Sequence, residues 1–402
     1  MSLHSRDPGP ANAGRDDSYV GSAFRRTVIA AIVLAALAVV AIDAHKPITS
    51  PYTYTDDVFP ILRDRCGRCH MQGGVAPMSL MTYKEAFPWG ESIRTELIAG
   101  HMPPWTVEAP VGTFRNSQGV TARELNVLMT WATGGNPVGN PELSLPAVAP
   151  SHAWPLGPPD LVVPMAADFT IPADATERTE EFTLRVPAPA SRPVRAVDLL
   201  PGNPMMVRSA TISVKGPADS GDPRGVHSER VLAVWVPGDA PVPLDGSAAL
   251  ALPPNAELVL RIHYKKTWEH EREAMTDRSS VGVYFAGTAA TRELRALTVS
   301  ADSAAVVQED LQALAIYPDS SLANVAVTVK ATRPDNSQVV LIRFRPQPDW
   351  ARRYWFSQPI VLPRGTRIDV SLAPDDLLPP GAPPIKSAAP SPARLTLNVA
   401  SR

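Results

Sequence analysis

Proline occurs so often along this chain that long helices are excluded from most of it. The 402 residues include 44 prolines, about twice the usual share of roughly 5%. A proline inside a helix removes a hydrogen bond and clashes with the preceding turn, whereas turns and strand ends accept it. The chain is therefore expected to consist mainly of short strands, turns and extended connections, with few helices.

The N-terminal segment predicts a membrane anchor. Residues 1–23 are polar and predict a disordered cytoplasmic tail. Arg25 and Arg26 precede an apolar run over residues 28–42, and the anchor is assigned to residues 24–44. A cleaved signal peptide is the alternative, but the long tail and the poor cleavage pattern at residues 42–44 favour an anchor. The arginines belong on the cytoplasmic side, so the expectation is a single-pass inner-membrane protein with its bulk in the periplasm.

The two cysteines of the chain belong to one motif, Cys66-Gly67-Arg68-Cys69-His70. This is the c-type haem attachment signature. Two thiols one helical turn apart can add to the two vinyl groups of one porphyrin, and the adjacent His70 can then bind the iron as proximal ligand. A zinc knuckle is the alternative, but zinc requires four ligands and the chain has no second cysteine pair. One covalent haem c on Cys66 and Cys69 is therefore expected.

Residues 45–137 predict a small helical cytochrome domain. A first helix is expected to run from Asp56 or Asp57, as cap, into the motif, with Pro60 in its first turn. A second helix is expected over residues 83–99. A third begins at Thr121, where Glu124 completes a capping box, and ends at Gly134. Trp131 on this third helix is expected to pack against the first.

The sixth iron ligand has four candidates in the sequence, namely Met78, Met81, His101 and Met102. Met102 is favoured because the two prolines after it hold an extended loop without a helical alternative. Met78 is the next choice. A thioether ligand would raise the haem potential relative to a second histidine.

The remainder of the chain predicts a β-structure. Residues 138–159 are rich in proline and alanine and read as a stiff linker. Short apolar runs separated by turn residues then recur, which is typical of antiparallel sandwiches or barrels. The expected runs are residues 194–200, 207–214, 230–236, 257–264, 281–285, 325–331, 338–344 and 367–372. The predicted class is α+β and multidomain: an anchor helix, an all-α cytochrome c domain, and two jelly-roll-like β-sandwiches at residues 160–290 and 291–402.

Two sets of segments carry a resemblance to a known family. In the helical half these are residues 70–74 (HMQGG), 76–80 (APMSL), Tyr83, Trp89 and residues 102–105 (MPPW). In the β-half they are residues 159–162, 201–203, 252–254, 258–264, 278–282 and 362–368. The chain resembles bacterial fusions of a cytochrome c domain with a copper type II, ascorbate-dependent monooxygenase-like domain, of the peptidylglycine hydroxylating kind. The resemblance implies Met102 as the distal iron ligand and two facing jelly-roll sandwiches.

The copper ligands that the resemblance implies are largely missing. The position of a His-His pair is taken by Arg208-Ser209, and that of a His-x-His pair by Asp319 and Ser321. His263 keeps a third position, but the later methionine is absent after residue 369. One imidazole alone binds copper weakly. Copper is therefore not expected, and His263 is interpreted as a vestigial, hydrogen-bonded side chain on a strand.

Three functions remain open at this point. The favoured one is an electron-transfer or scaffold subunit of a respiratory or photosynthetic membrane complex, with redox proteins as partners and the β-half as a pseudoenzyme platform. A haem-fed oxidoreductase acting in the β-half is the second, and a purely structural subunit is the third. The net charge of -2 gives no reason to expect a nucleic-acid partner.

Overall fold

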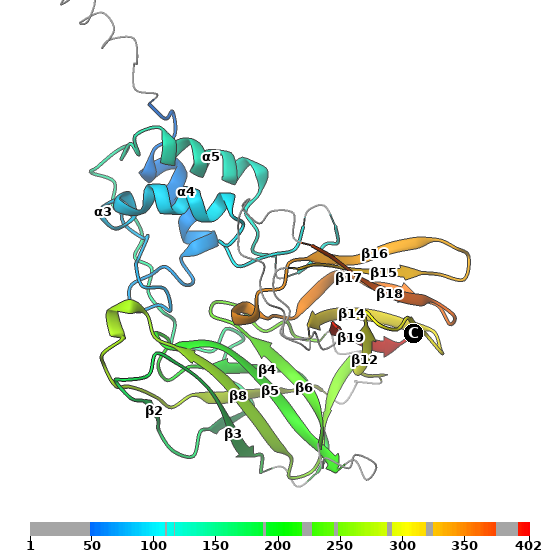
Figure 1. Cartoon of the computed structure of the whole chain (residues 1–402). Coiled ribbons are helices and arrows are strands. Elements are labelled where there is room, and N and C mark those ends of the chain that lie inside the picture. The colour runs from blue at the N-terminus through cyan, green and yellow to red at the C-terminus, as the bar shows by residue number, and fades with distance from the viewer. Residues whose placement is uncertain are drawn as a thin grey trace, which may run out of the picture. The chain divides into compact units, whose positions relative to one another are not determined.

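The computed structural model describes residues 49–108, 111–115, 117–187, 190–218, 227–244, 248–287, 292–318, 325–374 and 393–402 (Figure 1). The predicted tail at residues 1–23 and the predicted anchor at residues 24–44 lie outside them. Within these ranges, no helix is long and apolar enough to cross a bilayer. Ser50–Arg402 forms one compact unit, and its buried apolar side chains gather in three clusters.

The three expected helices are present, and they share the smallest of these clusters. The first is continuous through a π-helix η1 (Tyr54–Val58), α2 (Phe59–Ile61) and a second π-helix η2 (Leu62–Cys66). The second comprises α3 (Tyr83–Ala86), a 3-10 turn η3 (Phe87–Trp89) and α4 (Gly90–Ile98). The third is α5 (Ala122–Thr133), and Figure 1 shows it packed beside α4.

The first helix begins earlier than the sequence predicted. Thr53 is its N-cap, and the carboxylates of Asp56 and Asp57 accept hydrogen bonds from the Thr53 hydroxyl and amide. The two acids therefore lie in the first turn and are not the cap. Pro60 is accordingly beyond the first turn, which also corrects the prediction. It is tolerated there because it falls in the short α2 segment between two wide π-turns, one of which bonds Val58 N to Thr53 O at 3.1 Å.

The third helix matches its prediction closely. Thr121 and Glu124 form the complete capping box, and Trp131 packs on the first helix with its ring 6.1 Å from that of Tyr54. Trp131 is fully buried, and its indole N–H donates to the carbonyl of Pro137 at 3.1 Å. This side chain therefore anchors the helical cluster.

Strands are the main regular structure in the rest of the described chain, and every run expected from the sequence overlaps a strand. Those in the first half are β1 (Leu161–Pro164), β2 (Phe169–Ile171), β3 (Glu177–Arg185), β4 (Arg192–Leu200), β5 (Val207–Ala218), β6 (His227–Trp235), β7 (Ala248–Leu252), β8 (Glu257–Lys265), β9 (Met275–Asp277), β10 (Ser280–Phe285) and β11 (Arg292–Glu293). Those in the second half are β12 (Arg295–Ser300), β13 (Ala305–Val306), β14 (Leu311–Pro318), β15 (Val325–Thr332), β16 (Gln338–Phe344), β17 (Tyr354–Leu362), β18 (Arg367–Pro374) and β19 (Arg394–Ser401). Two 3-10 turns, η4 (Trp268–His270) and η5 (Pro348–Trp350), lie in connections.

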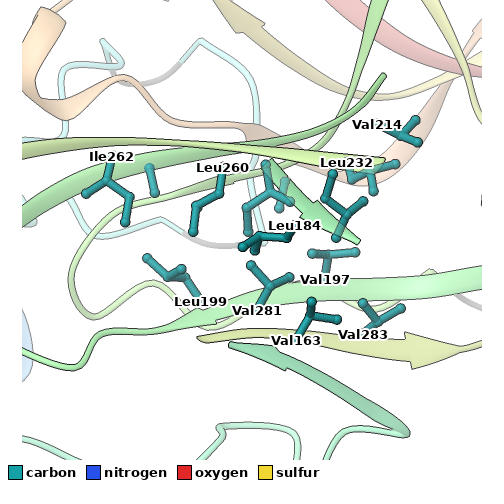
Figure 2. Close-up of a cluster of buried hydrophobic side chains, with 14 of the residues drawn as sticks. Val163, Leu184, Val197, Leu199, Val214, Leu232, Leu260, Ile262, Val281 and Val283 are labelled. Carbon is teal, nitrogen blue, oxygen red and sulfur yellow. The ribbon is translucent and has the colours of Figure 1, made fainter. Parts of the chain in front are cut away.

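Two sheets enclose the largest cluster. One has the order β1-β10-β4-β7-β11 and the other β3-β8-β5-β6, and the pairings are antiparallel except β11 with β7. Figure 2 shows Leu260 and Ile262 from β8 facing Leu199 of β4 and Val281 of β10 across the layer. Alternate residues of the facing strands point inward, as a two-layer β-packing requires.

A second pair of antiparallel sheets follows the same plan. Their orders are β12-β19-β14-β17 and β13-β18-β15-β16, and they enclose the remaining cluster. Phe114 and Trp105 also belong to this cluster, although the sequence assigned both to the cytochrome region. Backbone bridges join Val107 to Phe344 in β16 and Phe114 to Phe356 in β17. The segment that follows α4 therefore packs on the second pair of sheets before it returns to α5.

A buried carboxyl group makes stability of the first pair of sheets depend on pH. Asp198 in β4 is 2% exposed, and burial raises its pKa to about 7. The native state keeps this proton over a range in which the unfolded chain releases it, so stability falls as pH rises from about 4 through about 7. We expect Asp198→Asn to stabilise the protein at about pH 8, by roughly 1.4 kcal/mol for each pKa unit of the shift, and to have little effect near pH 4. Urea unfolding at the two pH values measures the difference, and an equal effect at both would contradict it.

Candidate functional site

Cys66, Cys69 and His70 lie on consecutive turns at the end of the first helix. Cys66 is the last residue of η2, and its carbonyl accepts hydrogen bonds from the amides of Cys69 at 3.1 Å and His70 at 2.9 Å. The helical path therefore continues through the motif and sets the two thiols one turn apart. Both cysteines are free thiols and are half-buried.

The loop after the motif folds back against it. The amide of Ala76 donates to the carbonyl of Cys69 at 3.2 Å, and that of Leu80 donates to the carbonyl of His70 at 3.0 Å. The close approach requires glycine at position 74, because a Cβ there would lie only 2.4 Å from the Cys69 carbonyl oxygen. The loop thus brings its backbone alongside the His70 ring.

The His70 imidazole is held by that loop. Its Nδ1 lies 3.2 Å from the carbonyl oxygen of Met78. When Nδ1 donates to this carbonyl, the proton is absent from Nε2, which keeps a lone pair for a metal. Burial lowers the pKa of His70, although the Met78 carbonyl opposes the shift. The ring is therefore neutral at neutral pH, which is the form that binds metals.

One cavity of about 330 Å³ collects the site residues that the sequence singled out. Cys66, Cys69, His70 and Met102 all line it, as does Met78. The apolar side chains that the helical region contributes to its wall include Leu62, Leu80, Trp89, Ile93, Leu97 and Leu128. The volume lies within the range of about 300–1,000 Å³ that is usual for cofactor pockets.

The other two candidates for the sixth ligand lie elsewhere. Met81 is 6% exposed and packs in the helical cluster, and it does not line the cavity. His101 is exposed, with Nδ1 3.1 Å from a carboxylate oxygen of Glu96. Met78 and Met102 remain, and they differ in backbone position. The carbonyl of Met78 is on the Nδ1 side of the His70 ring, whereas Met102 comes from the loop after α4.

The two thiols are protonated in this environment. Burial raises the pKa of the Cys66 thiol to about 12, and burial raises that of Cys69 to about 11, with Arg208 and Arg352 opposing the shift. Zinc binds thiolates whose sulfur atoms converge with two further ligands. Among the described residues, the group whose donor atoms converge in this way is Glu177, His263 and Asp349, and it contains neither cysteine.

Side chains from the β-half close part of the same cavity. Arg208, Pro237, Trp350 and Arg352 line it together with the helical residues. Sequence reasoning missed them, since they lie at least 138 positions beyond His70 in the chain and no local pattern links them to it. The one sequence feature that pointed toward Arg208 was the presence of Arg208-Ser209 at the position of the expected His-His pair.

Direct hydrogen bonds tie the motif to the β-half at this point. The Arg68 guanidinium donates to the carbonyl of Gly238 at 2.7 Å. The Gln118 amide donates to Asp239, and the Arg352 guanidinium lies 3.5 Å from the same carboxylate. The cavity wall is therefore shared between the helical region and the sheets.

The positions of the first expected copper are neighbours in the sheet. Ser209 in β5 faces His263 in β8, and Arg208 occupies a bulge between Val207 and Ser209. His263 Nε2 lies 2.8 Å from Glu177, in keeping with its interpretation as a hydrogen-bonded side chain on a strand. Asp319 and Ser321, the positions of the other expected pair, lie outside the described residues.

The acidic group beside His263 is neutralised by protein cations. Lys265 Nζ lies 3.2 Å from Glu177 and 3.1 Å from Asp349. The hydrogen bond from His263 is the main cause that lowers the pKa of Glu177. A metal ion would have to displace the Lys265 ammonium from between the two carboxylates.

Comparisons with known proteins add little to this description. No protein-family model matches the chain, and no curated protein matches its sequence. Among solved structures, a Paenibacillus xanthan lyase is similar at 9% sequence identity with a TM-score of 0.15. The match covers 64% of this chain and 28% of the lyase chain, so this chain spans little more than a quarter of that protein. A TM-score this low indicates neither a shared fold nor a shared function.

Proposed function

We propose that the chain is a c-type cytochrome, with one haem c attached through thioether bonds to Cys66 and Cys69. The single observation that carries the proposal is the cavity that both thiols, the His70 ring and Met102 line together. The donor set fits this cofactor, since a neutral imidazole with an engaged Nδ1 and a thioether are the axial ligands of cytochromes c. Protonated thiols that do not converge with other ligands suit addition to vinyl groups better than zinc binding.

Each residue then has a definite task. Cys66 and Cys69 fix the cofactor covalently, His70 binds the iron through Nε2, and the Met78 carbonyl orients the ring. Met102 would be the sixth ligand, because the Met78 backbone is already hydrogen-bonded to the His70 ring. The apolar wall excludes water and favours the less charged, reduced state. When bound, the cofactor supplies reversible transfer of single electrons.

Replacing the sixth ligand gives a test within this proposal. Met102→Ala is expected to abolish the methionine-to-iron charge-transfer band in the far-red absorption spectrum of the oxidised protein, while Met78→Ala retains it. The midpoint potential of Met102→Ala should also fall, because a thioether stabilises the reduced iron. Absorption spectra of both variants decide the matter. Loss of the charge-transfer band in Met78→Ala but not in Met102→Ala would identify Met78 as the sixth ligand instead.

We propose further that the β-half is a degenerate copper monooxygenase-like platform of two jelly-roll sandwiches. The adjacency of Ser209 and His263 supports this reading, because the resemblance assigns ligands of one copper to these positions. Arg208 and Ser209 cannot replace two imidazoles, and the Lys265 ammonium already neutralises the nearby carboxylates. Copper is thus not part of the proposal, and the platform serves to dock or hold partner proteins.

The whole protein is then an electron-transfer or scaffold subunit, anchored in the inner membrane by residues 24–44 with its bulk in the periplasm. Its partners are redox proteins of a respiratory or photosynthetic membrane complex. Gentle detergent extraction of native membranes, followed by affinity capture of this chain and mass spectrometry, tests the assignment. Membrane redox proteins should co-purify in a fixed ratio to this chain. The co-purified donor should reduce the haem within the turnover time of the captured complex. A chain recovered alone, with a haem that does not exchange electrons, would contradict the proposal.

A second candidate is an oxidoreductase in which the haem feeds a metal in the β-half. It is favoured by Glu177, His263 and Asp349, whose ligand atoms all lie within 4.8 Å of one another. Elemental analysis of the purified protein separates the two candidates. One iron atom per chain without copper supports the electron-transfer subunit. About two copper atoms per chain would instead support the oxidoreductase.

A further inference from the structure

A cation without an acidic partner lies in the wall of the haem cavity. Arg208, at the bulge of β5, lines the cavity, and its guanidinium carbon lies 5.3 Å from the centre of the Trp350 ring. Its Nε is buried without a hydrogen-bond partner, and it makes no ion pair within the described part of the chain. Burial lowers the pKa of Arg208, which reports the cost of holding this charge away from water. A buried charge normally requires a counter-charge.

A second arginine lies in the same wall and is more deeply buried. Arg352 is 2% exposed, and its guanidinium carbon lies 5.5 Å from the centre of the Trp105 ring. It approaches Asp239 only at 3.5 Å, and that carboxylate also accepts a hydrogen bond from Gln118. The Nε of Arg352 is buried without a partner. Most of its donor capacity is therefore available to a group in the cavity.

The other charged side chains of the wall have hydrogen-bond or ion-pair partners in the protein. Arg65 pairs with Glu124 at 3.1 Å, Arg68 donates to the Gly238 carbonyl, and Glu96 pairs with His101. The cavity wall therefore contains two incompletely paired arginines within the described residues: Arg208 makes no ion pair, and Arg352 reaches Asp239 only at 3.5 Å.

We propose that Arg208 and Arg352 bind the two propionate carboxylates of the haem, so that the β-half completes the haem site. The inference rests on the proposed haem attachment. Haem c carries two carboxylates, and Arg208 and Arg352 are the two arginines of the wall whose buried Nε has no hydrogen-bond partner. A guanidinium presents parallel N–H donors that match the two oxygens of a carboxylate. The flanking Trp350 and Trp105 rings hold the guanidinium groups of Arg208 and Arg352 in place.

This assignment gives the degenerate copper position a new role. Arg208 occupies a position at which the resemblance implies a copper-binding imidazole. The bulge at Arg208 breaks the alternation of β5, and bulges commonly redirect a side chain near functional sites. The haem would then join the helical region and the sheets through charge-assisted bonds, and its potential would respond to changes in the β-half.

The test compares Arg208→Gln, Arg352→Gln and the double variant with Arg261→Gln as control. Arg261 is an exposed residue of β8 that pairs with Glu181 and does not line the cavity. The decisive readout is the position of the propionate bending bands in the resonance Raman spectrum. We expect each cavity variant to shift one band and the double variant to shift both, with no shift in the control.

The midpoint potential is the second readout. A cation near the haem stabilises the reduced form, so Arg208→Gln and Arg352→Gln are expected to lower the potential. Arg208→Lys keeps the positive charge but loses the paired N–H donors of the guanidinium. Its midpoint potential should therefore stay close to the wild-type value, while one propionate band should still shift. A lowered midpoint potential with unchanged propionate bands would mean that the arginines act only as charges at a distance and do not bind the propionates, which would overturn the proposal. Arg208→Gln decides the question by itself if Arg352→Gln does not fold.

Haem staining after denaturation keeps the two proposals apart. All the arginine variants should retain covalent haem, because the thioether bonds do not involve arginine. If the wild-type chain carries no haem, the proposed function itself fails. If every variant carries haem with wild-type bands and potential, only the inference about Arg208 and Arg352 fails.

Discussion

A chain with serine at both position 66 and position 69 is expected to show no haem signal on a denaturing gel. A serine hydroxyl does not form the thioether bond that keeps the cofactor attached after unfolding. The helical turn that places both thiols beside the His70 ring is unaffected, since Cys69 and His70 bond to the Cys66 carbonyl through their backbones. The loss is therefore expected to be chemical, with circular dichroism of the strands unchanged.

The single variants and a control sharpen this expectation. Cys66→Ser and Cys69→Ser each remove one of two bonds, so each should lose most of the stable haem. Gln72→Ala, an exposed position two residues beyond the motif, should keep the wild-type signal. The measurement is haem-dependent peroxidase staining normalised to protein. Retention of the signal in the double variant would show that the cofactor is attached elsewhere or not covalently bound.

Trp131→Ala is expected to lower the free energy of unfolding by about 3–5 kcal/mol, as is usual for removing a buried large aromatic side chain. Trp131 is fully buried, contacts Tyr54 at 6.1 Å between ring centres, and donates to the Pro137 carbonyl. The substitution leaves a cavity and removes one of the two hydrogen bonds that the Pro137 carbonyl accepts, the other coming from the Tyr54 amide. Leu128, one turn earlier on α5, lines the cavity beside Cys66 and His70, so incorporation of the proposed haem should fall as well.

Trp268→Ala provides the matched control for this loss. Trp268 lies in η4 and is 59% exposed, so its removal should change stability by less than about 0.5 kcal/mol. Urea unfolding followed by circular dichroism in the helical region gives both values. Equal effects of the two substitutions would contradict the packing described for the helical cluster.

Local chemistry made much of the fold predictable. The capping box at Thr121 and Glu124 identified the start of α5, because both residues act within one turn of the chain. Alternating apolar residues between proline and glycine turns located the strands, because a strand with one buried face repeats every two residues. The closeness of Cys66, Cys69 and His70 was equally readable, since these residues are near one another in the chain.

Features that depend on distant contacts were not predictable in this way. The π-turns around Pro60 depend on how the helix reaches the motif, and composition does not signal them. The docking of Val107 and Phe114 on β16 and β17 joins segments more than 200 residues apart (344 less 107). Arg208 and Arg352 reach the cavity through the same long-range packing, so the sequence suggested a lost copper ligand at Arg208 and no new contact.

The central claim is that Cys66 and Cys69 carry one covalent haem, and peptide mass spectrometry of the protein exported by a host with a haem attachment system tests it most directly. The proteolytic fragment that contains residues 66–70 should carry the mass of one haem, and the pyridine haemochrome spectrum of the intact protein should be that of a haem with both vinyl groups saturated. A fragment with two unmodified thiols, in a protein that is otherwise folded and exported, would contradict the claim.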